Sequence, residues 1–175
     1  MNYNEKPESV RQRASEIKLL LLDVDGVLTD GRLYFSDSGE EMKAFSALDG
    51  HGIRMLMAAD IEVGIVTGRS SELVARRSAE LGISLLLQDK QDKLAGTQKL
   101  CRRQGLALEQ VCYAGDDLPD LPAMQAVGLA LTVPGAHADI RSRAAAITEA
   151  AAGNGAVREI TDFLLHARGL YPQPE

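Results

Sequence analysis

The stretch that decides the fold is LLLLDVDGVLTD, residues 19–30, in which an apolar run leads directly into Asp23 and Asp25. Four consecutive leucines are typical of a strand that is buried on both faces of a parallel sheet. Ligands of open α/β sheets bind beside the carboxyl ends of the strands, and these two carboxylates follow such an end. An EF-hand calcium loop is excluded because Val27 and Leu28 stand where a third oxygen ligand and a glycine are required.

Apolar runs bounded by turn residues recur along the chain and predict five buried strands, at residues 17–22, 62–66, 84–87, 111–114 and 128–133. Segments of helical length separate or follow them, at residues 52–59, 70–81, 90–104, 118–126 and 156–167. Strands that alternate with helices form parallel sheets with helices on both faces. We therefore expect an α/β fold, a three-layer, doubly wound parallel sheet, in a single domain that spans residues 1–175.

Two segments depart from this alternation. The runs RLYFS and EEMKAF flank a turn-like Ser36-Asp37-Ser38-Gly39 and predict a β-hairpin arm at residues 30–47, after the first strand. Residues 152–175 are expected to form a loop, a helix and a tail, and Gly153 and Gly155 make that loop flexible enough to reach outward. No Pro-rich linker or internal repeat indicates a second domain.

Composition narrows the classes of function. The formal charge of −6, the 4% of aromatic residues and the scattered basic residues disfavour nucleic-acid binding. Neither an apolar signal segment nor a membrane span is apparent, so we expect no membrane partner and a cytoplasmic location. Cys101 and Cys112 lack metal-ligand spacing and are expected to be buried, reduced thiols.

Further polar residues follow the other predicted strands. Thr67, Gly68 and Arg69 come directly after the second strand, and Asp116 and Asp117 follow the fourth. The carboxyl ends of parallel strands meet at one edge of the sheet, so these side chains are expected to gather beside Asp23 and Asp25. An acidic cluster of this kind supplies the oxygen ligands that Mg²⁺ prefers and allows an acidic protein to bind an anionic phosphate.

The order and types of these residues resemble the haloacid dehalogenase superfamily of phosphotransferases. The resemblance rests on DVDGVLTD, the threonine of VTGR, Lys93 in QDKLAG, and GDDLPD, and it covers about residues 19–163. It implies that Asp23 is the nucleophile and that Asp25 is the general acid and base. It also implies that Thr67 and Lys93 bind the phosphoryl group.

The same resemblance implies a Mg²⁺ site formed by the carboxylates of Asp23 and Asp116 and the backbone carbonyl of Asp25. Asp117 and Asp120 stay open at this point. One of them orients the metal site or Lys93, or either begins the following helix, because acids favour helix N-termini.

Within the superfamily, the sequence closely resembles the 3-deoxy-D-manno-octulosonate 8-phosphate (KDO 8-phosphate) phosphatases, through FSALDGHGI, VTGRSSELVARRSAELGI and the tail GNGAVREITDFLL. These are capless homotetramers of lipopolysaccharide precursor synthesis that hydrolyse a sugar-acid phosphate. Here residues 25–67 leave room for a hairpin and a helix only, so no cap domain is expected. The resemblance implies that Thr67, Gly68, Arg69, Arg77 and Lys93 bind the substrate.

It also implies that the hairpin is an oligomerisation arm and that a neighbour's C-terminal tail closes the site. Ala152 and Asn154 depart from the commonest tail pattern. Three alternatives remain: a phosphatase of a nine-carbon, sialic-acid-type 9-phosphate, a broad-specificity sugar phosphatase, and a non-catalytic scaffold. Arg69 favours the eight-carbon substrate because relatives of the nine-carbon type tend to carry Glu there. A scaffold predicts loss of a catalytic residue, and none is lost.

Overall fold

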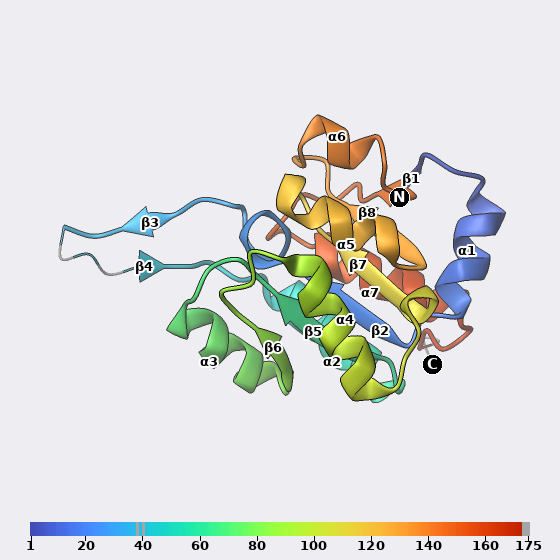
Figure 1. The fold of residues 1–175 in the computed structure, drawn as a ribbon, viewed down its shortest axis with the longest axis horizontal. Helices are drawn as coiled ribbons and strands as arrows, with labels where there is room; N and C mark the ends of the chain where they lie inside the picture. The colour runs from blue at the N-terminus through green and yellow to red at the C-terminus, as the bar shows by residue number, and fades with distance from the viewer. Residues whose placement is uncertain (38, 40, 173–175) are drawn as a thin grey trace.

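The structure is a computed structural model that describes residues 1–37, 39 and 41–172. Its main sheet has the strand order β1-β9-β8-β7-β2-β5-β6 (Figure 1). The strands are β1 (Asn2–Tyr3), β2 (Leu19–Leu22), β5 (Glu62–Val66), β6 (Leu85–Leu87), β7 (Val111–Ala114), β8 (Leu129–Thr132) and β9 (Ala146–Ile147). All neighbours are parallel except β1 and β9. The predicted doubly wound parallel sheet is confirmed.

The order of the strands places a crevice beside β2. From β2 the chain first adds β5 and β6 on one side and then β7, β8 and β9 on the other. Leu22, the last residue of β2, pairs with Ile65 of β5 and with Ala114 of β7, so the three strands end at about the same level. A sheet that reverses its winding direction opens a ligand crevice at this point.

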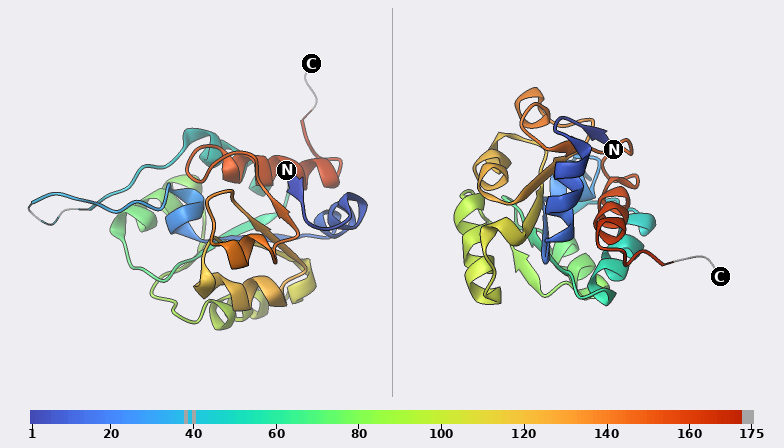
Figure 2. Two further views of the ribbon diagram at one scale, coloured as in Figure 1. Left: turned by 90° about the horizontal axis from the view of Figure 1, so that it is seen from above. Right: turned by 90° about the vertical axis from the view of Figure 1, so that its right-hand side faces the viewer.

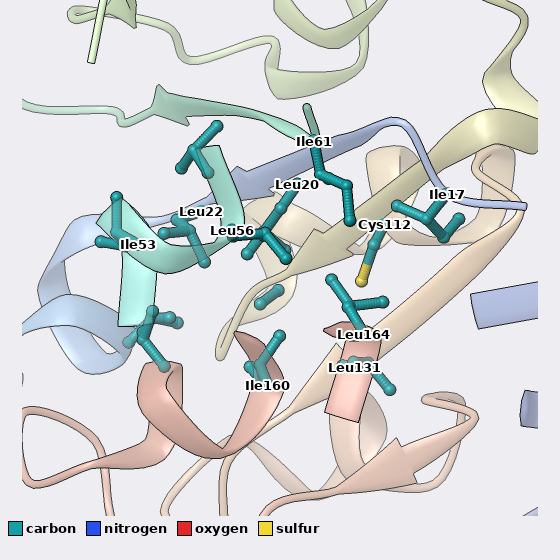
Figure 3. Packing of buried hydrophobic residues seen from close by; sticks show 14 of the residues in the cluster. Ile17, Leu20, Leu22, Ile53, Leu56, Ile61, Cys112, Leu131, Ile160 and Leu164 are labelled. Carbon is teal, nitrogen blue, oxygen red and sulfur yellow. The ribbon is translucent and has the colours of Figure 1, made fainter. Parts of the chain in front are cut away.

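Two helical layers cover the sheet. On one face lie α1 (Pro7–Ser15), α2 (Ala47–Ala58), α3 (Glu72–Leu81) and α7 (Ala156–Ala167), and their buried side chains form one core cluster with the sheet. Ile53, Leu56, Ile160 and Leu164 lie in the same cluster as Leu20 of β2 (Figure 3). On the other face, α4 (Lys93–Gln104), α5 (Leu121–Ala126) and α6 (Ala138–Arg141) pack in a second cluster. The alternating faces of the strands divide the core between the layers.

Several elements differ from the sequence prediction. The strands β1 and β9 and the helices α1 and α6 were not predicted. Strands of two residues carry no periodic pattern to detect. α2 begins at Ala47 instead of residue 52, after Ser46, which accepts a hydrogen bond from the Asp49 N–H. α4 begins at Lys93 instead of residue 90, because Asp92 caps it by accepting the Ala95 N–H.

The predicted hairpin is confirmed. Its strands β3 (Tyr34–Phe35) and β4 (Glu41–Met42) are antiparallel, and the Gly39 N–H donates to the Ser36 carbonyl in the turn. Ser38 of that predicted turn lies outside the described residues. The arm projects well beyond the body of the molecule (Figures 1 and 2). It exposes Phe35 and Met42, which are 60% and 61% accessible.

The loop before α7 lies against its own chain. The Gly153 N–H donates to the carbonyl of Val27, in the short turn η1 (Val24–Leu28) that follows β2. Gly153 has φ +65, and a Cβ there would lie 2.7 Å from the Asp30 nitrogen. The loop therefore packs on the segment after β2, although the sequence indicated a loop flexible enough to reach outward.

Cys101 and Cys112 are buried and unbridged, which confirms the prediction of reduced thiols. Within the described part of the chain, no helix has both the length and the apolar character needed to cross a bilayer.

Candidate active site

A pocket of about 350 Å³ opens at the carboxyl ends of β2, β5 and β7. Its volume falls within the usual range for small-molecule sites. It is lined by Asp23, Asp25, Gly31, Thr67, Gly68, Arg69, Lys90, Gln91, Lys93, Asp116, Asp117, Pro119 and Asp120. Strand ends that are far apart in the sequence thus bring together every predicted site residue except Arg77.

A buried row of opposite charges forms the floor of the pocket. Lys93, at the first position of α4, places its ammonium 2.9 Å from Asp23 Oδ2 and 2.6 Å from Asp120 Oδ1. All three side chains are less than a tenth exposed. A buried ammonium needs such partners, because an unpaired charge is costly to remove from water. The row fixes Lys93 beside Asp23.

Asp120 accepts hydrogen bonds from neighbouring groups at both of its carboxylate oxygens. Its Oδ1 also accepts the Tyr113 hydroxyl at 2.8 Å, and its Oδ2 accepts the backbone N–H groups of Asp116 and Asp117. With Lys93 these four donors satisfy both oxygens of a carboxylate that is 0% exposed. Asp120 therefore orients Lys93 and the loop after β7.

The sequence left the roles of Asp117 and Asp120 open. In the structure the two side chains make different contacts. Asp117 begins the short turn η3 (Leu118–Asp120), where its side chain accepts the Leu118 N–H. Tyr113 was not predicted to take part in the site. It lies in a continuous apolar run, and only its hydroxyl distinguishes it from core filler.

The acids of the pocket have shifted pKa values. Burial, and then the negative charge of Asp120, raise the pKa of Asp23 above its usual range, although Lys93 opposes the shift. Burial and the charges of Asp23 and Asp120 raise the pKa of Asp116 to about 7. For Lys93, burial lowers the pKa, but the charges of Asp23 and Asp120 outweigh it and the net change is upward. The site carries more negative charge than Lys93 offsets.

This excess of negative charge fits a divalent cation. Oxygens of Asp23, Asp116 and Asp120 lie within 4.8 Å of one another, and those of Asp23 and Asp116 remain available to an ion. Gly26, with φ +93, makes room for the Asp116 carboxylate, since a Cβ there would lie 2.0 Å from its Oδ2. Carboxylate oxygens are the ligands that Mg²⁺ uses in proteins.

Asp25 has different surroundings from Asp23. Its side chain is 20% exposed, and Lys43 of the hairpin stem donates a hydrogen bond to its Oδ1. The Arg69 Nε lies 3.7 Å from its Oδ2. Glu41 contacts both cations. Its Oε1 lies 3.2 Å from Lys43 Nζ and 3.4 Å from a guanidinium nitrogen of Arg69. The sequence did not predict that Lys43 and Glu41 lie near the site, because their segment indicated only a hairpin strand.

Thr67 and Arg77 occupy contrasting places. Thr67 is buried directly after β5, and its side chain lines the pocket. Its Oγ1 accepts the backbone N–H of Arg69 at 3.5 Å. Arg77, on α3, pairs with Glu80 and donates to the Ser46 carbonyl. It lines a neighbouring pocket, so a single chain does not bring it to the site.

Comparison with known proteins places this site in a family. The family model for haloacid dehalogenase-like hydrolases matches residues 86–160. The 3-deoxy-D-manno-octulosonate 8-phosphate phosphatase KdsC of Escherichia coli is 47% identical over 95% of this chain and 89% of its own length. The chain belongs to the KdsC family.

Solved KdsC structures have the same fold. The phosphatase of Yersinia pestis superposes with a TM-score of 0.92 at 44% identity, over 94% of this chain and 89% of that one. The Moraxella catarrhalis phosphatase, solved with a magnesium ion, a phosphate ion and KDO, gives a TM-score of 0.93 at 40% identity over 95% of each chain. The pocket and its acidic cluster therefore lie in a fold shared with these phosphatases.

Proposed function

We propose that this protein is a Mg²⁺-dependent phosphomonoesterase that hydrolyses KDO 8-phosphate to KDO and phosphate, in lipopolysaccharide precursor synthesis. Membership in the KdsC family supports the substrate, and the Moraxella relative that holds magnesium, phosphate and KDO supports both the substrate and the metal. The observation that carries the proposal is the convergence of Asp23, Thr67, Lys93 and Asp116 in one pocket.

In the first step, we assign Asp23 as the nucleophile. One of its carboxylate oxygens attacks phosphorus, the bond from phosphorus to the sugar oxygen breaks, and an aspartyl phosphate forms. Asp25 donates its proton to the departing alkoxide. Lys93 and Thr67 hold the phosphoryl oxygens while negative charge spreads over them.

In the second step, Asp25 accepts a proton from water as the water oxygen attacks phosphorus. The bond to Asp23 breaks, inorganic phosphate leaves, and both carboxylates return to their starting states. Asp23, Asp116 and the Asp25 carbonyl would hold Mg²⁺, which neutralises phosphate charge in the crowded acidic pocket. Asp120 keeps Lys93 aligned throughout both steps.

Phosphate release from a panel of substrates tests this proposal. The panel contains KDO 8-phosphate, a sialic-acid-type 9-phosphate, hexose phosphates and p-nitrophenyl phosphate, with Mg²⁺ and with EDTA as the control. We expect EDTA to abolish turnover and kcat/KM for KDO 8-phosphate to exceed the others by at least about 100-fold, which is about 2.7 kcal/mol of transition-state discrimination.

Other outcomes of the same assay separate the alternatives. Flat, metal-dependent activity across the panel identifies a broad-specificity phosphatase, and a preference for the 9-phosphate identifies the nine-carbon type. Inactivity on every compound favours a scaffold. Arg69 lines the pocket and is 45% exposed, and we assign it to the carboxylate of the sugar acid.

We also propose a homotetramer built on the hairpin. The described part of the arm exposes large apolar side chains that the chain itself does not cover, namely Leu33, Tyr34, Phe35 and Met42. An exposed apolar patch of this kind is typical of a protein interface. In a tetramer, Arg77 and the C-terminal tail would act on a neighbour's site. Light scattering at micromolar concentration distinguishes a tetramer from a monomer, and Phe35→Asp should dissociate it.

The location that fits this activity is the cytoplasm. Two buried, unbridged cysteines are typical of proteins from a reducing compartment. Immunoblots of cytosolic and membrane fractions test the assignment.

A further inference from the structure

The hairpin stem places a buried charge next to Asp25, outside the catalytic pocket. The Lys43 side chain is 1% exposed, yet its ammonium lies between two carboxylates, of Asp25 and Glu41. Lys43 does not line the catalytic pocket. It lines the adjacent pocket that contains Arg77, so it reaches Asp25 from outside the catalytic pocket.

The contacts around Asp25 hold its Oδ1 and place a cation near its Oδ2. Lys43 holds Oδ1 and Arg69 faces Oδ2 at 3.7 Å. Glu41 holds the two cations together and accepts the Ser71 hydroxyl at 3.1 Å through its other oxygen. Ser71 begins α3 without capping it, so this hydroxyl is directed to the hairpin.

We propose that Lys43 and Glu41 are positioning residues for Asp25. This inference rests on the proposed function, in which Asp25 transfers the proton at the leaving oxygen. Asp25 lines an open pocket and keeps 20% of its side chain exposed, so on that side only polar contacts can select one rotamer of its carboxyl group. The buried ammonium supplies that selection, and misplacement of a catalytic group by about 1 Å costs about 100-fold in rate.

The arrangement gives the hairpin a second role besides assembly. Its strands expose Phe35 and Met42, whereas Lys43, directly after β4, contacts Asp25 and is paired with Glu41. The stem is thus part of the catalytic machinery of its own chain.

The test compares Lys43→Met with the wild type on two substrates. KDO 8-phosphate releases an alkoxide that needs a proton, whereas p-nitrophenyl phosphate releases a stable anion that does not. We expect kcat for KDO 8-phosphate to fall about 10-fold to 100-fold with KM changed less than about 3-fold, and kcat for p-nitrophenyl phosphate to fall much less. Glu41→Gln should show the same selectivity with a smaller loss.

Two controls separate positioning from damage to the fold or the assembly. Lys99→Met removes an exposed lysine of α4 and should leave both rates unchanged. In the Asp25→Asn background, Lys43→Met should not slow phosphoenzyme formation further, because Lys43 acts through Asp25. Circular dichroism and light scattering check that each variant is folded and assembled.

The outcomes distinguish this inference from the proposed function. Equal losses on both substrates, unchanged rates, or an additive loss in the Asp25→Asn background would overturn the positioning role while leaving an active phosphatase. A wild-type protein that releases no phosphate from any substrate would overturn the proposed function, and the positioning role with it.

Discussion

Asp23 and Asp25 are separated by one residue, yet the fold gives them opposite surroundings. Asp23 is 6% exposed and meets Lys93, whose ammonium also contacts the fully buried Asp120. Asp25 is more open and meets cations from the hairpin and from the loop after β5. A nucleophile needs a fixed line of attack, whereas a proton carrier must reach first a leaving group and then water. The difference in surroundings matches this division of labour.

Removal of the proposed nucleophile should have the largest effect. Asp23→Asn keeps the size of the side chain but eliminates the attacking oxygen, so kcat should fall by at least about 10⁴-fold. The far-ultraviolet circular dichroism spectrum should stay that of the wild type. Turnover near the wild-type level in this variant would show that Asp23 is not the nucleophile.

Asp25→Asn should have the second largest effect and a different signature. Loss of the acid and base should lower kcat for KDO 8-phosphate about 10²-fold to 10⁴-fold. Because Asp23 is intact, phosphate should remain covalently attached to protein quenched in acid, as ³²P counting can measure. Asp23→Asn is the matched control and should hold no label. Equal labelling of the two variants would contradict the assignment of separate roles.

The pH dependence of stability should expose the excess charge around Asp23. The raised pKa values of Asp23 and Asp116 mean that the metal-free fold binds protons more tightly than the unfolded chain does. Their stabilising contribution is therefore fully present below the unfolded pKa near 3.8 and is lost as pH rises through the folded values, up to about 7.

The metal-free Tm should accordingly fall between about pH 5 and pH 8, and Mg²⁺ should raise Tm more at pH 8 than at pH 5.5, because protons compete for the same oxygens. Differential scanning fluorimetry with and without Mg²⁺ measures both effects. Asp116→Asn should flatten the pH profile. A Mg²⁺ shift that is equal at the two pH values would contradict this account.

Tyr113→Phe should have the smallest effect, and it tests how strongly Asp120 is held beside Lys93. It removes one of four hydrogen bonds to Asp120, so the free energy of unfolding should fall by roughly 1 kcal/mol. Lys93 and two backbone N–H groups still hold the carboxylate, and kcat should change less than about 10-fold. Urea denaturation gives the stability, and a larger loss of activity than of stability would assign Tyr113 a role in catalysis.

The sequence predicted the surroundings of Asp23 better than those of Asp25. Asp23, Thr67 and Asp116 each follow a continuous apolar run, so their strands and their common edge can be predicted from the pattern. Lys43 follows a two-residue strand, and its contact with Asp25 depends on how the hairpin folds back. Such a contact leaves no local signal in the sequence.

The first turns of α2 were missed for a related reason. Gly50 and Gly52 disfavour helix by about 1 kcal/mol each, so the local sequence argues against the helix that forms. Tertiary packing explains both glycines. A Cβ on Gly50 would lie 2.4 Å from a guanidinium nitrogen of Arg77, and one on Gly52 would lie 2.2 Å from Thr161 Oγ1. Close approach of α3 and α7 overrides the local preference.

The contact between Gly153 and Val27 has a consequence for how the enzyme is made. The turn that carries the catalytic acids is synthesised early, but the backbone group that supports it emerges from the ribosome more than a hundred residues later. A nascent chain that has not yet reached residue 153 therefore lacks this support for the turn, and the contact can form only after the segment before α7 has been made.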